Sequence, residues 1–442
     1  MQPAKDAAPS KPGVVSVDTG NSGGPIHAAY RIAPASYLYS MNRLRLLAIL
    51  LLLFLNVRAG NPLRTGIWRA ELQINDTLFL PFTFLSSENG IDLMNGKERL
   101  PVNEISFVGD SVLFRFPVFD AEIRCLQFGD SLTGYFHNYM RKTKNRIPFR
   151  AAAGQGFRFS DRPEKPVAEL GGRWQLIFDD ETGENRFAVA EFEQDGPRLT
   201  GTIRTPTGDH RFLEGECSGK HVRLSAFDGS HAFLYTAELQ ADSSLRGHFF
   251  SGMHHHETWM AVRKADAELP DPDALAFLRP GYSTLDFNFP DHNGKRWTPR
   301  DPSFINKVLV VQLLGSWCPN CMDETAFLSD YYRMQRDRGV EIIGVAYERT
   351  TDSLRIWKNI DRFRNFHHVD YPLVYGGYAS KDSAAKTLPM LNRVFAFPTT
   401  IIIDRKGQVR RVHSGFNGPA TGQAYKKETA ELSAFIDRLL AE

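Results

Sequence analysis

Residues 307–321 read KVLVVQLLGSWCPNC. The run up to Leu314 is almost entirely apolar, which indicates a buried strand, and a Cys-x-x-Cys pair follows it at once. A cysteine between such a strand and the first turn of a helix lies beside unpaired backbone N–H groups and the positive end of the helix dipole, which stabilise a thiolate. Pro319 suits that first turn. The stretch therefore predicts an exchangeable dithiol, with Cys318 as the attacking thiolate and Cys321 as the partly buried resolving thiol.

The sequence around this stretch alternates between strand and helix patterns. The last expected helix has the clearest apolar stripe, formed by Leu432, Phe435, Ile436, Leu439 and Leu440. The expected order is a strand at 307–314, a helix after the cysteines, a strand at 340–347, helices around 354–363 and 383–388, a hairpin at 399–404 and 409–413, and a final helix. This order predicts an α/β domain with a mixed sheet at 281–442.

Zinc sites use the same cysteine spacing, so the pair by itself leaves two chemistries open. A tetrahedral zinc site needs a second pair of ligands, and the other two cysteines, Cys125 and Cys217, lie far away in the sequence. No close pair of His or Cys follows within 281–442. The ligand count therefore favours a redox-active Cys318–Cys321 disulfide, with no metal and no further cofactor.

Three motifs together resemble the thioredoxin superfamily: GSWCPNC at 315–321, FAFPTT at 395–400 and a DRKG turn at 404–407. Over about residues 283–442 the chain is similar, within that superfamily, to the TlpA/ResA-like extracytoplasmic thiol–disulfide oxidoreductases. The resemblance implies a thioredoxin fold with a cis peptide bond before Pro398, beside the cysteines. It also implies that the backbone at Phe397 pairs with a substrate peptide and that Trp317 shields the site from water. The alternatives are an ordinary strand-entry proline and a tryptophan that only packs.

The resemblance also bears on proton chemistry. Thioredoxin has a buried aspartate six residues before its first cysteine, where this chain has Gln312, and an amide cannot act as a base. Glu324 matches a carboxylate of ResA-like members, which implies that it handles the Cys321 proton; the alternative is that it only complements the helix dipole. Pro319 and Asn320 differ from the corresponding pairs of the relatives, and residues at these two places tune the redox potential.

The N-terminal region predicts an export signal. Arg43 and Arg45 precede an apolar run at 46–55, and a small-x-small site at 57–59 follows. This run is too short to span a bilayer, which needs about 20 residues. We therefore expect a signal peptide at 41–59 and an exported protein of the periplasm or cell envelope. Residues 1–40, rich in Ala, Pro, Ser and Gly, are expected to be an unstructured extension, with Met41 as the true start.

Residues 60–265 carry strand patterns and turn pairs, and the pattern occurs twice. Gly66-Ile67-Trp68 matches Gly172-Arg173-Trp174, and LTGYF at 132–136 matches LRGHF at 245–249. We expect two all-β units, sandwiches or barrels, at 60–156 and 166–265. A link at 157–166 and a Pro- and Asp-rich linker at 266–280 would join them to each other and to the α/β domain.

Other candidate sites are weaker. The run at His254–His256, with His248, could bind a metal, but a strand sends alternate side chains to opposite faces, which favours a solvated strand edge. Cys125 and Cys217 are either buried free thiols or an inter-repeat disulfide. His413 and Asn417 are interpreted as structural. The formal charge of +2, without a basic block among aromatics, gives no nucleic-acid surface.

Two functions fit these patterns. The first is an enzyme that exchanges disulfides with a client protein through the CPNC dithiol, most simply an envelope reductase fed by a membrane thiol donor. The alternative is an envelope binding protein whose β repeats recognise a partner and whose thioredoxin-like domain is a tether. A peroxide-reducing relative would need a threonine before its cysteine, and Ser316-Trp317-Cys318 does not provide one. The presence of both cysteines favours the enzyme, while the client and the role of the repeats stay open.

Overall fold

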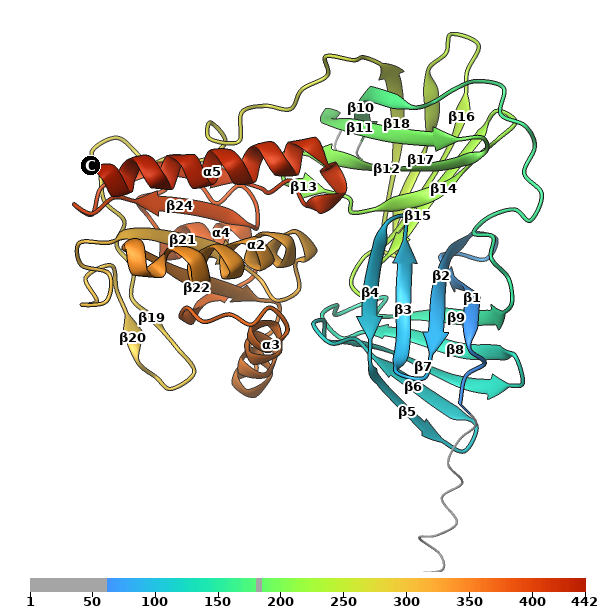
Figure 1. Ribbon diagram of the computed structural model, residues 1–442, viewed down its shortest axis with the longest axis horizontal. Coiled ribbons are helices and arrows are strands. Elements are labelled where there is room, and N and C mark those ends of the chain that lie inside the picture. The colour runs from blue at the N-terminus through green and yellow to red at the C-terminus, as the bar shows by residue number, and fades with distance from the viewer. Residues whose placement is uncertain (1–61, 180–184) are drawn as a thin grey trace, which may run out of the picture. The chain divides into compact units, whose positions relative to one another are not determined.

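The computed structural model describes residues 62–179 and 185–442, which belong to one compact unit (Figure 1). The extension and the signal peptide predicted for 1–59 lie outside the described residues. In the described part, residues 66–263 are almost entirely strand and turn, and α-helices begin only after Cys318. The expected division into an all-β part and an α/β part is confirmed. No helix of the described residues is long and apolar enough to cross a bilayer.

The first β repeat is a nine-stranded antiparallel sheet in the order β4-β3-β2-β1-β9-β8-β7-β6-β5. Its strands alternate between core and surface; in β3, Ile91 and Leu93 are buried and their neighbours are less so. Gly96 (φ +54°) and Gly109 (φ +57°) provide the left-handed backbone of two tight turns. The strands are β1 (Gly66–Gln73), β2 (Phe79–Ser87), β3 (Gly90–Asn95), β4 (Glu98–Val102), β5 (Glu104–Val108), β6 (Ser111–Arg115), β7 (Ala121–Phe128), β8 (Ser131–Asn138) and β9 (Arg146–Ala153).

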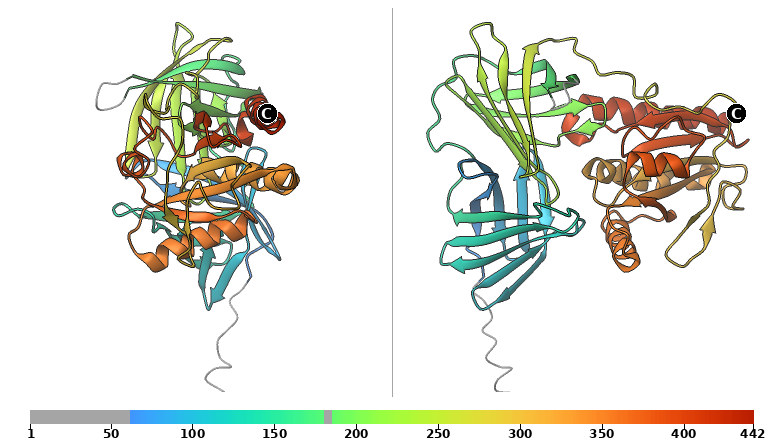
Figure 2. Two further views of the ribbon diagram at one scale, coloured as in Figure 1. Left: turned by 90° about the vertical axis from the view of Figure 1, so that its left-hand side faces the viewer. Right: turned by 180° about the vertical axis from the view of Figure 1, so that it is seen from behind.

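The second β repeat is also a nine-stranded sheet, in the order β11-β10-β18-β17-β16-β15-β14-β12-β13. An additional pairing between β11 and β12 closes the sheet into a barrel, which is visible from behind in Figure 2. The strands are β10 (Gly172–Asp179), β11 (Asn185–Asp195), β12 (Arg198–Thr205), β13 (Gly208–Asp209), β14 (Leu213–Ser218), β15 (His221–Phe227), β16 (Ala232–Leu239), β17 (Leu245–Ser251) and β18 (His255–Arg263).

The two repeats share details that the sequence match predicted. Trp68 and Trp174 are both buried in the first strand of their repeat, and each donates its indole N–H to the carbonyl oxygen four residues earlier, at 2.8 Å in both cases. Gly134 and Gly247 lie in the eighth strand of each sheet, where a Cβ would be 2.0 Å and 1.8 Å from a carbonyl oxygen of the neighbouring strand. Only glycine fits such positions. The tandem β repeats are therefore confirmed.

The C-terminal part contains a five-stranded mixed sheet in the order β23-β22-β21-β24-β25. Strands β23, β22 and β21 are parallel to one another, β24 pairs antiparallel with β21, and β25 pairs antiparallel with β24. The elements are the short hairpin β19 (Phe289–Pro290) and β20 (Arg296–Trp297), β21 (Val308–Leu314), α2 (Pro319–Gln335), β22 (Val340–Glu348), α3 (Ser353–Phe366), β23 (Leu373–Tyr378), α4 (Lys381–Thr387), β24 (Thr399–Ile403), β25 (Val409–Ser414) and α5 (Gln423–Ala441). Strand β23 is the one element of this sheet that the sequence did not indicate.

The central strand β21 is buried along its whole length. Val308 and Val310 belong to a core shared with α2, α3 and α5, whereas Leu309 and Val311 belong to a second core that includes α4 and the segment before β21. A strand covered on both faces must be a continuous apolar run, which explains the sequence at 308–314. Gln312 is its one polar residue and is fully buried.

Candidate active site

The two cysteines lie at the junction of β21 and α2, where the sequence placed them, and form a disulfide. Cys318 is the N-cap of α2, and its Sγ accepts the backbone N–H of Cys321 at 3.2 Å. Pro319 occupies the start of the helix, where its missing N–H costs nothing. Cys318 is 5% exposed and Cys321 is fully buried. The outer sulfur therefore faces the helix N-terminus and the inner one is enclosed beneath it.

The residues implied by the resemblance gather around Cys318. The peptide bond between Phe397 and Pro398 is cis. The Phe397 carbonyl oxygen lies 3.4 Å from Cys318 Sγ. The ring of Trp317 meets that of Phe397 edge to face, with centroids 5.8 Å apart, and the Trp317 indole N–H donates to the Tyr347 carbonyl at 2.8 Å. Because Trp317 and Phe397 are both half-buried, they form the rim of the dithiol.

Glu324 lies on α2 one turn after Cys321 and is 1% exposed. Its carboxylate accepts hydrogen bonds from Gln312 Nε2 at 2.7 Å and from Thr400 Oγ1 at 2.5 Å. Burial raises the pKa of Glu324 to about 7, although both hydrogen bonds lower it. The effect of a helix dipole falls off within the first turn, and Glu324 lies just beyond the first turn of α2. A carboxyl that titrates near neutrality beside a dithiol is suited to proton transfer.

The sequence did not indicate the side chains that hold this carboxylate. Gln312 is fixed in turn by Thr325, whose Oγ1 donates to Gln312 Oε1 at 3.0 Å. Thr400 reaches Glu324 from the neighbouring strand β24, which pairs with β21. The available signal was Gln312 itself, a lone polar residue within an apolar strand, because such a residue must find a buried partner.

A second buried carboxylate supports the loop before the cysteines. Glu348, at the end of β22, accepts hydrogen bonds from the backbone N–H of Ser316 at 2.9 Å and from Ser316 Oγ at 2.7 Å. Burial raises the pKa of Glu348 to about 7. Glu348 therefore fixes the backbone that presents Trp317 and Cys318, and the sequence alone did not indicate it.

Pro319 and Asn320 are not free surface residues. Asn320 Nδ2 lies 3.2 Å from the carbonyl oxygen of Asp209 and 3.2 Å from Asp209 Oδ1, and the Pro319 carbonyl accepts a hydrogen bond from Arg211. Asp209 and Arg211 belong to the second β repeat, and no sequence pattern linked them to the dithiol. The part of the CPNC motif expected to tune the thiolate is thus in contact with the repeats.

The remaining candidates lie elsewhere. Cys125 and Cys217 are free thiols, both buried, which excludes the inter-repeat disulfide in this structure. Burial raises the pKa of the Cys125 thiol to about 12, so this cysteine is unreactive at neutral pH. His255 lies 3.2 Å from Glu257 at the start of β18. Within residues 62–179 and 185–442, no group of three or more His, Cys, Asp or Glu side chains is arranged to hold a metal ion.

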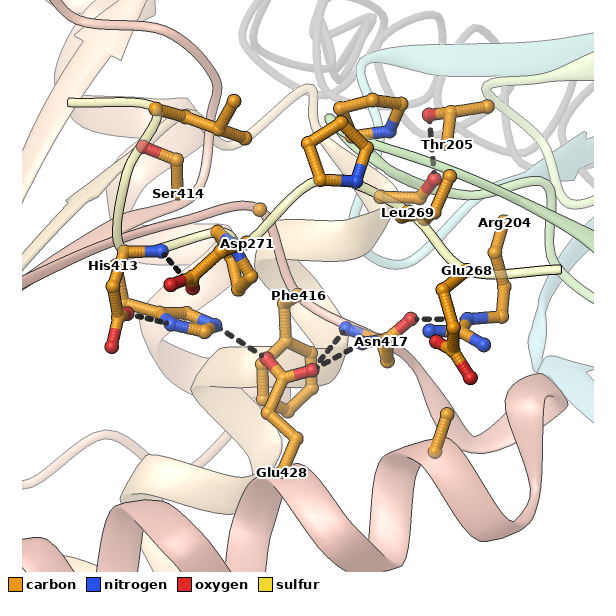
Figure 3. Close-up of a pocket in the computed structure, with 18 of the residues that line it drawn as sticks. Arg204, Thr205, Glu268, Leu269, Asp271, His413, Ser414, Phe416, Asn417 and Glu428 are labelled. Atoms are coloured by element: carbon orange, nitrogen blue, oxygen red, sulfur yellow. Dashed lines mark hydrogen bonds and ion pairs between the residues drawn. The ribbon is translucent and has the colours of Figure 1, made fainter. Parts of the chain in front are cut away.

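His413 and Asn417 line a pocket of about 450 Å³ beside α5 (Figure 3). The His413 ring lies between two carboxylates, 2.7 Å from Asp273 and 3.0 Å from Glu428. Asn417 donates to Glu428 through Nδ2 and accepts from Arg204 Nε at 2.9 Å. These contacts join the C-terminal hairpin, α5, the linker and the second repeat, in agreement with a structural role.

Comparisons with known proteins concern the region around this site. Residues 279–428 match the Redoxin family model. Thiol-disulfide oxidoreductase ResA of Geobacillus thermodenitrificans is 24% identical over 135 residues, which cover 30% of this chain and 69% of ResA. Thiol:disulfide interchange protein DsbE of Allochromatium vinosum is 25% identical over 149 residues, covering 34% of this chain and 72% of DsbE.

Solved structures are also similar to part of the chain. One is a thiol-disulfide oxidoreductase from Bacteroides fragilis, at 18% identity and a TM-score of 0.25, covering 33% of this chain and 99% of the other. The Redoxin match at residues 279–428 includes the CPNC dithiol and the five-stranded mixed sheet described above. The Redoxin match and the likeness to ResA and DsbE support a TlpA/ResA-like domain of the thioredoxin superfamily in the C-terminal region of the chain.

Proposed function

We propose that the chain is a reductase of disulfide-containing client proteins in the cell envelope, working through Cys318 and Cys321 without a further cofactor. The observation that carries this proposal is the Cys318–Cys321 disulfide at the N-terminus of α2, with the Phe397 carbonyl beside its outer sulfur. The export pattern at 41–59 supports the compartment.

The proposed reaction is a two-step exchange. The Cys318 thiolate attacks one sulfur of the client disulfide, forms a mixed disulfide and releases the first client thiolate, which takes up a proton. Cys321 then loses its proton and attacks Cys318 Sγ, which releases the second client thiol and closes the Cys318–Cys321 disulfide. Two electrons pass to the client, and a membrane-embedded dithiol donor would return them to the enzyme.

Each neighbouring residue has a proposed part in this exchange. Glu324 accepts the proton of Cys321 in the second step, for which a pKa near 7 is suitable. The half-buried Trp317 and Phe397 form the contact surface for the client chain beside Cys318, and Pro398 holds the backbone at Phe397 in place. Pro319 and Asn320 set the thiolate stability through the geometry of the first helical turn.

The test is the reduction potential of the Cys318–Cys321 pair in the exported chain, equilibrated against glutathione and dithiothreitol, together with trapping by Cys321→Ser. A potential near that of thioredoxin, about −270 mV, supports a reductase, whereas one near about −120 mV would reverse the direction of electron flow. Cys321→Ser should accumulate a mixed disulfide with a client, and Cys318→Ser should not. If the pair formed no exchangeable disulfide, the enzymatic proposal would fail and a binding role would replace it.

A further inference from the structure

The loop that carries the dithiol is covered by the β repeats. A thiolate that attacks a disulfide on another protein needs open space in front of its sulfur, because the incoming disulfide must approach in line. Pro319 is buried and Asn320 is only 9% exposed, although both lie in the turn between the two cysteines. The covering segments come from both repeats and meet the loop on several sides.

The second repeat makes the closest contact, through its segment 208–211. Asp209 is 2% exposed; its carbonyl and its Oδ1 both lie 3.2 Å from Asn320 Nδ2, and Oδ1 also accepts the backbone N–H of Gly418 at 2.7 Å. A Cβ on Gly208 would lie 2.6 Å from Asn320 Cγ. The repeat therefore fits against Asn320 without room for one additional carbon atom.

Arg211 ties the two repeats and the α/β domain together. Its Nη1 donates to Asp323 Oδ2 at 2.5 Å and to the Pro319 carbonyl at 3.4 Å, and its Nη2 pairs with Glu98 of the first repeat. Arg211 is 5% exposed, and the facing carboxylates keep it charged. A buried arginine with two carboxylate partners from different segments holds those segments in one arrangement, because removing it leaves their charges uncompensated.

Further contacts from both repeats complete this cover over the CPNC loop, which we call the wall. Met322 and Pro319 face Val118 and Phe119 of the first repeat around a cavity of about 20 Å³, which is room for one water molecule at most. Ser230 Oγ donates to the Trp317 carbonyl at 3.3 Å. What stays half-exposed around Cys318 is the side bounded by Trp317 and Phe397.

We propose that Asp209 and Arg211 are specificity-determining residues: they hold the β repeats as a wall over the CPNC loop. Small disulfides and disulfides of extended client chains then reach Cys318 along the side bounded by Trp317 and Phe397, and disulfides on the surface of a folded protein do not. This inference rests on the proposed disulfide-reducing function. It gives the repeats a role in substrate choice, exerted at the dithiol itself. A disulfide on a folded client reaches Cys318 only when the wall moves away from the CPNC loop.

The test compares two substrates on the full exported chain, kept reduced by dithiothreitol: 2-hydroxyethyl disulfide as the small disulfide and insulin as the folded protein. Arg211→Gln removes the tie, and Gly208→Ala pushes the wall from Asn320 while leaving every charge in place. In both variants we expect kcat/KM for insulin, relative to the small disulfide, to rise about tenfold. For Arg211→Gln this is the factor that one lost charge-assisted hydrogen bond gives in a docking equilibrium. For Gly208→Ala the cause is the overlap of the new Cβ with Asn320.

The matched control is Arg223→Gln. Arg223 pairs with Glu216 and Ser160 inside the β part and is more exposed than Arg211. Its loss removes an arginine–glutamate pair without touching the wall, so the ratio should not change. An unchanged ratio in folded Arg211→Gln or Gly208→Ala, or an equal change for both substrates, would overturn the inference. A wild-type chain that reduces neither substrate would instead overturn the proposed function.

A measurement on the wild type needs no variant. In the reduced chain, N-ethylmaleimide should modify Cys318 much faster than a maleimide carried on a bulky polymer does. The ratio of these two rates should be much larger on Cys318 than on a free peptide thiol. Equal relative rates would show that the dithiol is open to large partners and would also overturn the inference.

Discussion

Glu324 is a carboxyl group that the fold keeps poised to exchange a proton. Burial raises the pKa of Glu324, and the hydrogen bonds from Gln312 and Thr400 lower it. Burial has the larger effect, so the pKa is about 7. Glu324→Gln keeps the shape and removes the proton acceptor, so closure of the disulfide by Cys321 should slow by about 10²-fold. The rate of wild-type closure should also rise with pH through 7, and this dependence should vanish in the variant. Stopped-flow tryptophan fluorescence during oxidation would measure both effects.

Glu348→Gln is the control for that experiment. Glu348 is equally buried and burial raises its pKa to about 7 as well, but it binds Ser316 and does not lie on α2 with Cys321. The control should lower stability and leave the pH profile of closure in place. If both variants lost the pH dependence equally, Glu324 would have no special part in the proton transfer.

His413 makes stability depend on pH in the alkaline range. Burial lowers the pKa of His413 and the hydrogen bonds to Asp273 and Glu428 raise it, with a net value of about 9 against 6.5 when unfolded. Its stabilisation is therefore complete below pH 6.5 and is lost as the pH rises through 9. The difference between the two pKa values corresponds to at most about 3 kcal/mol of the free energy of unfolding.

We therefore expect His413→Asn to lower the free energy of unfolding in urea by about 2–3 kcal/mol at slightly acid pH, and by much less above pH 9, where the wild-type histidine is neutral as well. Comparing the variant with the wild type at each pH removes the contributions of other titrating groups. A difference that stayed constant across this range would mean that His413 contributes by packing alone.

At the scale of elements, the sequence predicted what depends on periodicity. Strand β21 and helix α5 follow from an apolar run and an apolar stripe, and the Cys-x-x-Cys pair marks the start of α2. Strand β23 was missed because Gly376 and Gly377 interrupt its pattern; it forms because Val345 and Ala346 of β22 offer a paired edge to Val374 and Tyr375. Tertiary pairing overrode local preference there.

The repeats allow a prediction on paired elements. Trp68 in β1 and Trp174 in β10 make the same indole hydrogen bond, so Trp68→Phe and Trp174→Phe should cost similar free energies of unfolding, about 2 kcal/mol each for the unsatisfied carbonyl and the lost ring volume. Calorimetry of both variants measures this. Neither change should alter the reduction potential of the dithiol. Costs that differed several-fold would show that the two first strands are not structurally equivalent.

At the scale of the whole molecule, the important contacts have no local signature. Asp209 and Asn320 are 111 residues apart in the sequence, and Arg211 and Glu98 are 113 apart. Each residue type alone is common on surfaces, so nothing near it indicates a buried partner. The CPNC motif could thus be predicted from the sequence, whereas the wall over it could not.

The same contacts bear on how the chain unfolds. One continuous core contains Phe114 of the first repeat together with Leu328 of α2, and Arg211 joins both repeats to that helix. Separate domains with small interfaces unfold in separate steps, but a shared core with a buried ion network couples them. We therefore expect residues 62–442 to unfold in one calorimetric transition, and Arg211→Gln to divide it into two. Two transitions in the wild type would show that the β repeats and the thioredoxin-like domain are energetically independent, and the wall would then be too weakly held to select substrates.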